Sequence, residues 1–130
     1  MLGLAGLAAA IEFLHERTIA ALEQQQRELT TRLISGLEPL VGVKVHGPPA
    51  SEKRLPVVSF TVDDYDPQDV AAMLDATYGV ECRAGLHCAG RMHRALGTLE
   101  TGGTVRLSLG WASTAEEIDH ALRALREISN

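Results

Sequence analysis

Lysine is scarce in this sequence, which has only Lys44 and Lys53 and a formal net charge of -5. Binding to nucleic-acid backbones depends on clustered lysine and arginine, so no nucleic-acid partner is expected. Long apolar runs are also missing, because charges interrupt them far short of the roughly 20 residues that a membrane-spanning helix needs. The first residues lack the basic segment of a signal peptide and soon reach Glu12. We therefore expect no export signal and no membrane partner.

Cysteine is scarce as well, with Cys82 and Cys88 as the two thiols. A strand end and a turn are predicted between them, which disfavours a bridge, and structural disulfides are typical of small secreted domains. Reduced thiols in a cytoplasmic protein are the expectation. The paired C-x-x-C spacing of zinc sites is missing around Cys82, His87, Cys88 and His93, so we expect no bound metal.

One compact domain is expected, because 130 residues with 45% hydrophobic content suffice for one core and not for two. Apolar periodicity predicts a helical segment over residues 4–34, with a break at 15–18 and an end at Gly36. Three further helices are predicted: over residues 67–78, in a short stretch that ends at 96, and from 113 onward. Runs of β-branched residues between turn glycines predict strands over residues 41–45, 57–62, 80–83 and 104–109. This mixture predicts an α/β domain of the two-layer α+β kind, with helices on one face of a small mixed or antiparallel sheet.

Two helix starts carry specific capping signals. Asp66 followed by Pro67 predicts the start of the 67–78 helix, and Gly79 predicts its end. Ser113 with Glu116 three residues later is typical of a capping box, and it predicts the start of the last helix.

A loop flanked by Gly85 and Gly90 brings a guanidinium, an imidazole and a thiol together, on Arg83, His87 and Cys88. Nearby cations lower the pKa of a thiol, and the thiolate is the nucleophile, so this pattern is typical of a reactive cysteine. The alternatives are that Cys88 is a small buried apolar residue and that His87 is an ordinary exposed polar one. Cys82 falls on a predicted strand and is expected in the core.

Arg106 lies in a predicted strand between Val105 and Leu107, where burying an unpaired charge is costly. Either its side chain faces solvent, or an anion meets it. The planar guanidinium suits bidentate binding of a carboxylate. The remaining histidines, His15, His46, His93 and His120, are expected at the surface.

Four segments together resemble class V aminotransferase-type enzymes, in particular the cysteine desulfurase and selenocysteine lyase group. Residues 83–89 are similar to that family's R-x-G-x-H-C motif, and residues 97–108 to its segment ending V-R-x-S. Residues 113–119 resemble the start of the helix that follows, and residues 3–14 the helix that leaves the cofactor domain. The resemblance covers essentially the whole chain and implies the C-terminal domain of a fold-type I pyridoxal-phosphate-dependent transferase.

The resemblance implies a reaction in which pyridoxal phosphate activates L-cysteine and an enzyme thiol takes its sulfur, leaving alanine and a persulfide. By position, Cys88 would be the catalytic thiol and Arg106 the group that binds the substrate carboxylate. Arg83 would support Arg106 as a second cation, with His87 as a neighbour in the same substrate-binding pocket. The resemblance also implies a homodimer in the full enzyme and a protein that accepts the sulfur.

The lysine that holds the cofactor in this family has no counterpart here, because neither Lys44 nor Lys53 lies in a matching context. We expect residues 1–36 to be a helical segment that leads to a missing cofactor domain, and residues 37–130 to be the C-terminal small domain. The isolated chain is expected to be inactive and to bind no cofactor. Two alternatives stay open: a persulfide carrier or interaction module without cofactor chemistry, and a free-standing domain with inert cysteines.

Overall fold

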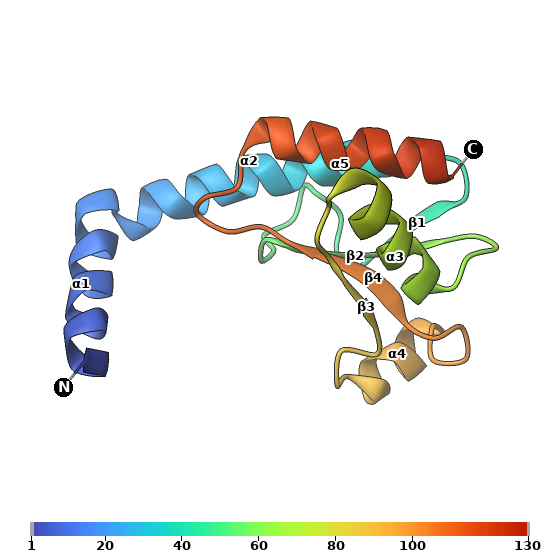
Figure 1. The fold of residues 1–130 in the computed structure, drawn as a ribbon, viewed down its shortest axis with the longest axis horizontal. Helices are drawn as coiled ribbons and strands as arrows, with labels where there is room; N and C mark the ends of the chain where they lie inside the picture. Colours follow the sequence, from blue (N-terminus) through green and yellow to red (C-terminus); the bar gives the residue numbers. More distant parts are fainter. Residues whose placement is uncertain (1, 130) are drawn as a thin grey trace.

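The computed structural model describes residues 2–129, which form five helices and a four-stranded sheet (Figure 1). The helices are α1 (Leu2–Arg17), α2 (Ile19–Leu37), α3 (Pro67–Tyr78), α4 (Gly90–Leu96) and α5 (Ala115–Ile128), and the strands are β1 (Val43–His46), β2 (Val57–Val62), β3 (Arg83–Gly85) and β4 (Thr104–Ser108). The α/β class predicted from the sequence is confirmed. No helix within the described residues is long and apolar enough to cross a membrane.

The sheet is antiparallel throughout, with the strand order β1-β2-β4-β3. The alternation of β2 turns Val58 and Phe60 inward, where both are fully buried together with Val105 of β4. Helices α2, α3 and α5 contact this core from one side, and α2 and α5 lie alongside each other over the sheet (Figure 1). The opposite face carries the polar residues of the alternation and is where the candidate site lies.

The predicted break in the first helical segment is confirmed at Thr18, which separates α1 from α2. Thr18 has a left-handed φ of 59°, and its hydroxyl accepts a hydrogen bond from the amide of Ala21 at 3.2 Å. Helix α1 projects away from the domain and has no buried residue (Figure 1). At the elbow, Phe13 packs edge-on against Trp111 with 4.9 Å between ring centroids, and the Arg17 guanidinium lies over both rings.

The predicted end of α2 at Gly36 falls one residue short, because α2 runs to Leu37 and Gly36 is its penultimate residue. A Cβ at this position would come within 2.3 Å of the Leu122 side chain on α5. The glycine is therefore used for the close approach of two helices, and not as a stop signal. A pattern along one segment cannot distinguish these two uses, since the second depends on a distant helix.

The capping signals are confirmed at α3 and shifted by one residue at α5. Asp66 caps the amide of Gln68 at 2.8 Å, and Gly79 ends α3 in a left-handed conformation. At α5 the capping box is formed by Thr114 and Glu117, and not by the predicted Ser113 and Glu116. Ser113 instead accepts a hydrogen bond from the amide of Gly110, within the preceding turn. The sequence offers both pairs at the same spacing, so local pattern alone does not choose between them.

The third predicted strand is displaced along the chain, from residues 80–83 to Arg83–Gly85. Val80 and Cys82 pack against the core as loop residues, because the ladder with β4 begins only where Arg83 meets Arg106. The first strand is shifted in the same direction and ends at His46, which is buried. These shifts change the bounds of both strands, and Val43 and Val45 still pack against the core, as their alternation predicts.

Candidate functional site

Cys88 lies in the loop of residues 86–89, between β3 and α4, as a free and exposed thiol. The alternative that Cys88 is a buried apolar residue is therefore wrong. Both His87 and Cys88 adopt left-handed backbone conformations, with φ values of 49° and 57°. Consecutive non-glycine residues in this region are strained, and the surrounding structure must hold them there. Cys82, in contrast, is half-buried against the core, and burial raises its pKa.

Two glycines allow the base of this loop to form. Gly85 and Gly103 both have positive φ values, of 103° and 102°, and their backbones approach each other closely. A Cβ on Gly103 would lie 2.2 Å from the carbonyl oxygen of Gly85, closer than real atoms come. Only glycine at position 103 is compatible with this crossing of the chain.

Gly103→Ala should therefore destabilise the domain by about 3 kcal/mol or more, through strain and a backbone clash. Gly110→Ala is the matched control, because a Cβ there meets no atom of the described residues within 4 Å and the backbone is not left-handed. We expect the control to change the unfolding free energy by less than about 0.5 kcal/mol. Urea unfolding of both variants checks this, and equal stabilities would refute the close approach.

Arg83 and Arg106 are direct partners across the β3 and β4 ladder, and Ser59 is the partner of Arg106 on β2. Val105 and Leu107 on either side of Arg106 are buried in the core, so Arg106 points to the opposite face of the sheet. Arg83 is exposed and Arg106 is half-buried. The two guanidinium groups therefore share one face, although strand order could not be predicted from the sequence.

No carboxylate within residues 2–129 forms an ion pair with either arginine. The Nε atom of Arg106 is buried and has no hydrogen-bond partner in that part of the chain. Adjacent positive charges repel, and an unpaired buried donor is costly, so the arrangement favours an anion at this position. The geometry supports the second interpretation of Arg106, in which it meets an anion.

His87 is half-buried, and its Nε2 atom lies 3.1 Å from the carbonyl oxygen of Thr104 at the start of β4. Burial lowers the pKa of His87, and the nearby charges of Arg106, His93 and Arg83 lower it further, against the opposing effect of the hydrogen bond to Thr104. The interpretation of His87 as a merely exposed polar residue is wrong.

The prediction that His46 and His93 lie at the surface is wrong, since they are only 8% and 3% exposed, whereas His15 and His120 are exposed. Nε2 of His46 lies 3.1 Å from the hydroxyl of Thr61. Burial lowers the pKa of His46, and Lys44 and His93 add to this effect. Hydroxyl partners compensate for burial of these imidazoles, which a single-residue preference cannot predict.

The lowered pKa values of His46 and His87 predict a pH dependence of stability. Both lie below the ordinary value of 6.5, so the folded chain binds fewer protons than the unfolded chain as pH falls below about 6.5. Stability is full above pH 6.5 and falls below it. Unfolding free energies measured between pH 5 and 8 should show this slope, which His46→Gln should reduce and His15→Gln should leave unchanged. An unchanged slope in His46→Gln would contradict the argument.

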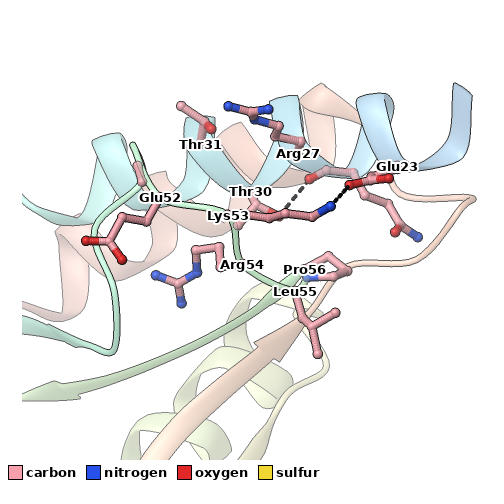
Figure 2. A pocket seen from close by; sticks show the side chains of 11 residues that line it. Glu23, Arg27, Thr30, Thr31, Glu52, Lys53, Arg54, Leu55 and Pro56 are labelled. Carbon is pink, nitrogen blue, oxygen red and sulfur yellow. Dashed lines mark hydrogen bonds and ion pairs between the residues drawn. The ribbon is translucent and has the colours of Figure 1, made fainter. Parts of the chain in front are cut away.

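The two lysines, Lys44 and Lys53, are both exposed. Lys53 is 86% exposed and forms an ion pair with Glu23 at 3.0 Å, in a hollow between α2 and residues 50–56 (Figure 2). Lys44 is exposed on β1. None of the predicted site residues lines the hollow of Figure 2. Among the described residues, no group of three or more histidine, cysteine or acidic side chains could hold a metal ion.

Comparisons with known proteins agree on the kind of protein this chain is similar to. The family profile described as Aminotransferase class-V matches residues 1–121. A probable cysteine desulfurase of Methanothermobacter thermautotrophicus is 34% identical over 98% of this chain, and one of Halalkalibacterium halodurans is 36% identical over 96%. The apo structure of a cysteine desulfurase from Thermococcus onnurineus NA1 superposes on 95% of this chain with a TM-score of 0.86 and 35% identity.

A second solved structure, the cysteine desulfurase CsdA (S-sulfonic acid) from Escherichia coli, is 28% identical with a TM-score of 0.77 over 94% of this chain. This chain spans only about 30% of the length of these proteins: 31% and 29% of the two relatives, and 30% and 29% of the two solved structures. About 70% of the length of each of those proteins therefore has no counterpart in this chain.

Proposed function

The chain belongs to the class V aminotransferase family, and on that premise we propose that it is the C-terminal part of a pyridoxal-phosphate-dependent cysteine desulfurase. In this proposal Cys88 accepts sulfur from L-cysteine as a persulfide. The observation that carries it is the exposed thiol of Cys88, in a strained loop next to the strands that bear Arg83 and Arg106. The named relatives support cysteine as the sulfur donor over selenocysteine.

Arg106 is proposed to bind the carboxylate of the substrate amino acid. Its half-buried guanidinium, with no carboxylate partner in the described residues, is free to form two parallel hydrogen bonds to such a group. Arg83 adds a second positive charge from the neighbouring strand. Holding the amino acid in one orientation would place its sulfur where a thiolate can attack it.

Pyridoxal phosphate, when bound to the complete enzyme, would supply the electron sink that allows the carbon–sulfur bond to break. The exposed Lys44 and Lys53 do not fit the role of its covalent partner, so we place the cofactor in the part of the enzyme that precedes this chain's matching region. Residues 1–36 would lead from that part to the small domain of residues 37–130. The apolar residues that α1 leaves exposed, Leu2, Leu4, Leu7, Ile11 and Leu14, would pack against it.

Reconstitution with a cofactor domain from one of the similar cysteine desulfurases tests this proposal. The isolated chain should release no alanine from cysteine, and the mixture or fusion should release it with sulfur on Cys88. Alanine release by the cofactor domain at the same rate without this chain would contradict the enzymatic role. Sulfur on Cys88 from a partner's persulfide, without restored alanine release, would instead favour a cofactor-free persulfide carrier. The homodimer, the sulfur-accepting protein and the cytoplasmic location remain parts of the proposal.

A further inference from the structure

A buried pair of side chains near the Cys88 loop has no part in the proposed reaction. His93 and Thr98 are 3% and 5% exposed, and the Nδ1 atom of His93 lies 2.8 Å from the hydroxyl oxygen of Thr98. The amide of Thr98 donates to the carbonyl of His93, and the amide of Gly103 donates to the carbonyl of Thr98, each at 2.9 Å. The pair is thus fixed between the end of α4 and the start of β4.

The His93 ring packs against His87, with 5.9 Å between ring centroids and a tilt of 44°. Nε2 of His87 lies 3.1 Å from the Thr104 carbonyl oxygen, which can only accept, and 3.5 Å from the Thr104 hydroxyl, so the shorter contact favours a hydrogen on Nε2. A second proton on the His87 ring would sit on Nδ1, which is buried and has no hydrogen-bond partner among the described residues. The resulting positive charge would also lie near the charge of Arg106, so this protonation is unfavourable. One neutral tautomer of His87 therefore fits this environment.

The fixed imidazole bears directly on Cys88, which is the next residue. Left-handed backbone at both His87 and Cys88 costs free energy and persists only where contacts compensate for it. The side chain of His87 supplies two such contacts, a hydrogen bond to Thr104 and packing against His93. Loss of either would allow the loop to relax toward ordinary backbone angles and move the thiol.

We propose that His93 and Thr98 are positioning residues for the sulfur-accepting loop: together they hold His87 as the Nε2–H tautomer, and with it the left-handed backbone at Cys88. The functional meaning of this role rests on the proposed function of Cys88. Thr98 sets the orientation of the His93 ring, and His93 supports the face of His87. The sequence signal is modest, a histidine five residues after the cysteine and a threonine five residues further on.

Nuclear magnetic resonance of the full 130-residue chain tests the proposal through His87 itself. The imidazole ¹⁵N shifts of wild type should report the Nε2–H tautomer, and strong intraresidue amide-to-Hα contacts at His87 and Cys88 should report positive φ. Thr98→Val removes the partner of a buried imidazole nitrogen. We expect exchange of the His87 Nε2 hydrogen to become roughly tenfold faster, as for loss of one hydrogen bond, and the Cys88 signature of positive φ to weaken.

Thr98→Ser keeps the hydroxyl and should restore both signals. Thr101→Val is the matched control, because among residues 2–129 its hydroxyl bonds to the Thr98 carbonyl alone, at 3.3 Å. An unchanged amide signal of Val105 shows that the sheet is intact in each variant. The proposal would be overturned if both Thr98→Val and His93→Phe kept the wild-type exchange rate of the His87 Nε2 hydrogen and the wild-type tautomer of His87. These resonance signals do not depend on sulfur transfer. The positioning role of His93 and Thr98 can therefore be refuted while Cys88 still accepts sulfur, and it can be supported when Cys88 accepts none.

Discussion

Cys88→Ala is expected to reduce alanine formation from cysteine by on the order of 10³-fold or more in the reconstituted enzyme, because it removes the only exposed thiol of the described residues. An alanine side chain cannot form the sulfur–sulfur bond, whereas its small size leaves the loop intact. Initial rates of alanine release, measured with and without a thiol reductant, would give the size of the effect.

Cys82→Ala provides the matched control for this prediction. Cys82 is half-buried, packs against the core and has a raised pKa, so its thiol is poorly suited to attack a substrate. The control should keep alanine formation within about twofold of wild type, with at most a modest loss of stability. Comparable losses in both variants would indicate a structural effect, and full activity of Cys88→Ala would refute the catalytic assignment.

Arg106→Ala should raise the KM for cysteine by roughly 100-fold in the reconstituted enzyme, since it leaves the substrate carboxylate without its charged partner. Arg106→Lys keeps the charge but loses the planar fork, and a rise of about tenfold is expected. Arg83→Ala should have the smaller effect, because Arg83 is exposed. Steady-state kinetics over a range of cysteine concentrations measure each value.

Arg126→Ala on α5 is the control for loss of positive charge. Arg126 is exposed on a helix that packs on the other face of the sheet, so its removal should leave the KM unchanged. A KM in Arg106→Ala equal to that of the control would contradict the assignment of Arg106 to the carboxylate. A fall in kcat alone would indicate that Arg106 acts after binding.

Local sequence signals predicted the structure correctly at positions where a few neighbouring residues determine the conformation. The break at Thr18, the cap at Asp66 and the end of α3 at Gly79 each depend on the conformation of a few neighbouring residues. The family and the α/β class were also predicted correctly, from the motif around Cys88 and the mixture of elements. Confirmed family membership does not by itself test the roles of individual site residues.

The sequence failed where distant segments decide the outcome. Gly36 serves a helix contact with Leu122, and the β3 ladder begins where β4 can pair with it. The burial of His46 and His93 depends on threonine partners from elsewhere in the fold. For the same reason, the alignment of Arg83 with Arg106 followed only from strand order, which no motif encodes.

Peptide mapping by mass spectrometry tests the central claim most directly. The purified chain would be incubated with a pyridoxal-phosphate cysteine desulfurase and cysteine, alkylated under conditions that preserve persulfides, and digested. We predict a gain of one sulfur atom on the peptide that contains Cys88 and none on the peptide that contains Cys82. Sulfur on neither peptide, with slow alkylation of both thiols, would contradict the account of Cys88 as an accessible sulfur acceptor.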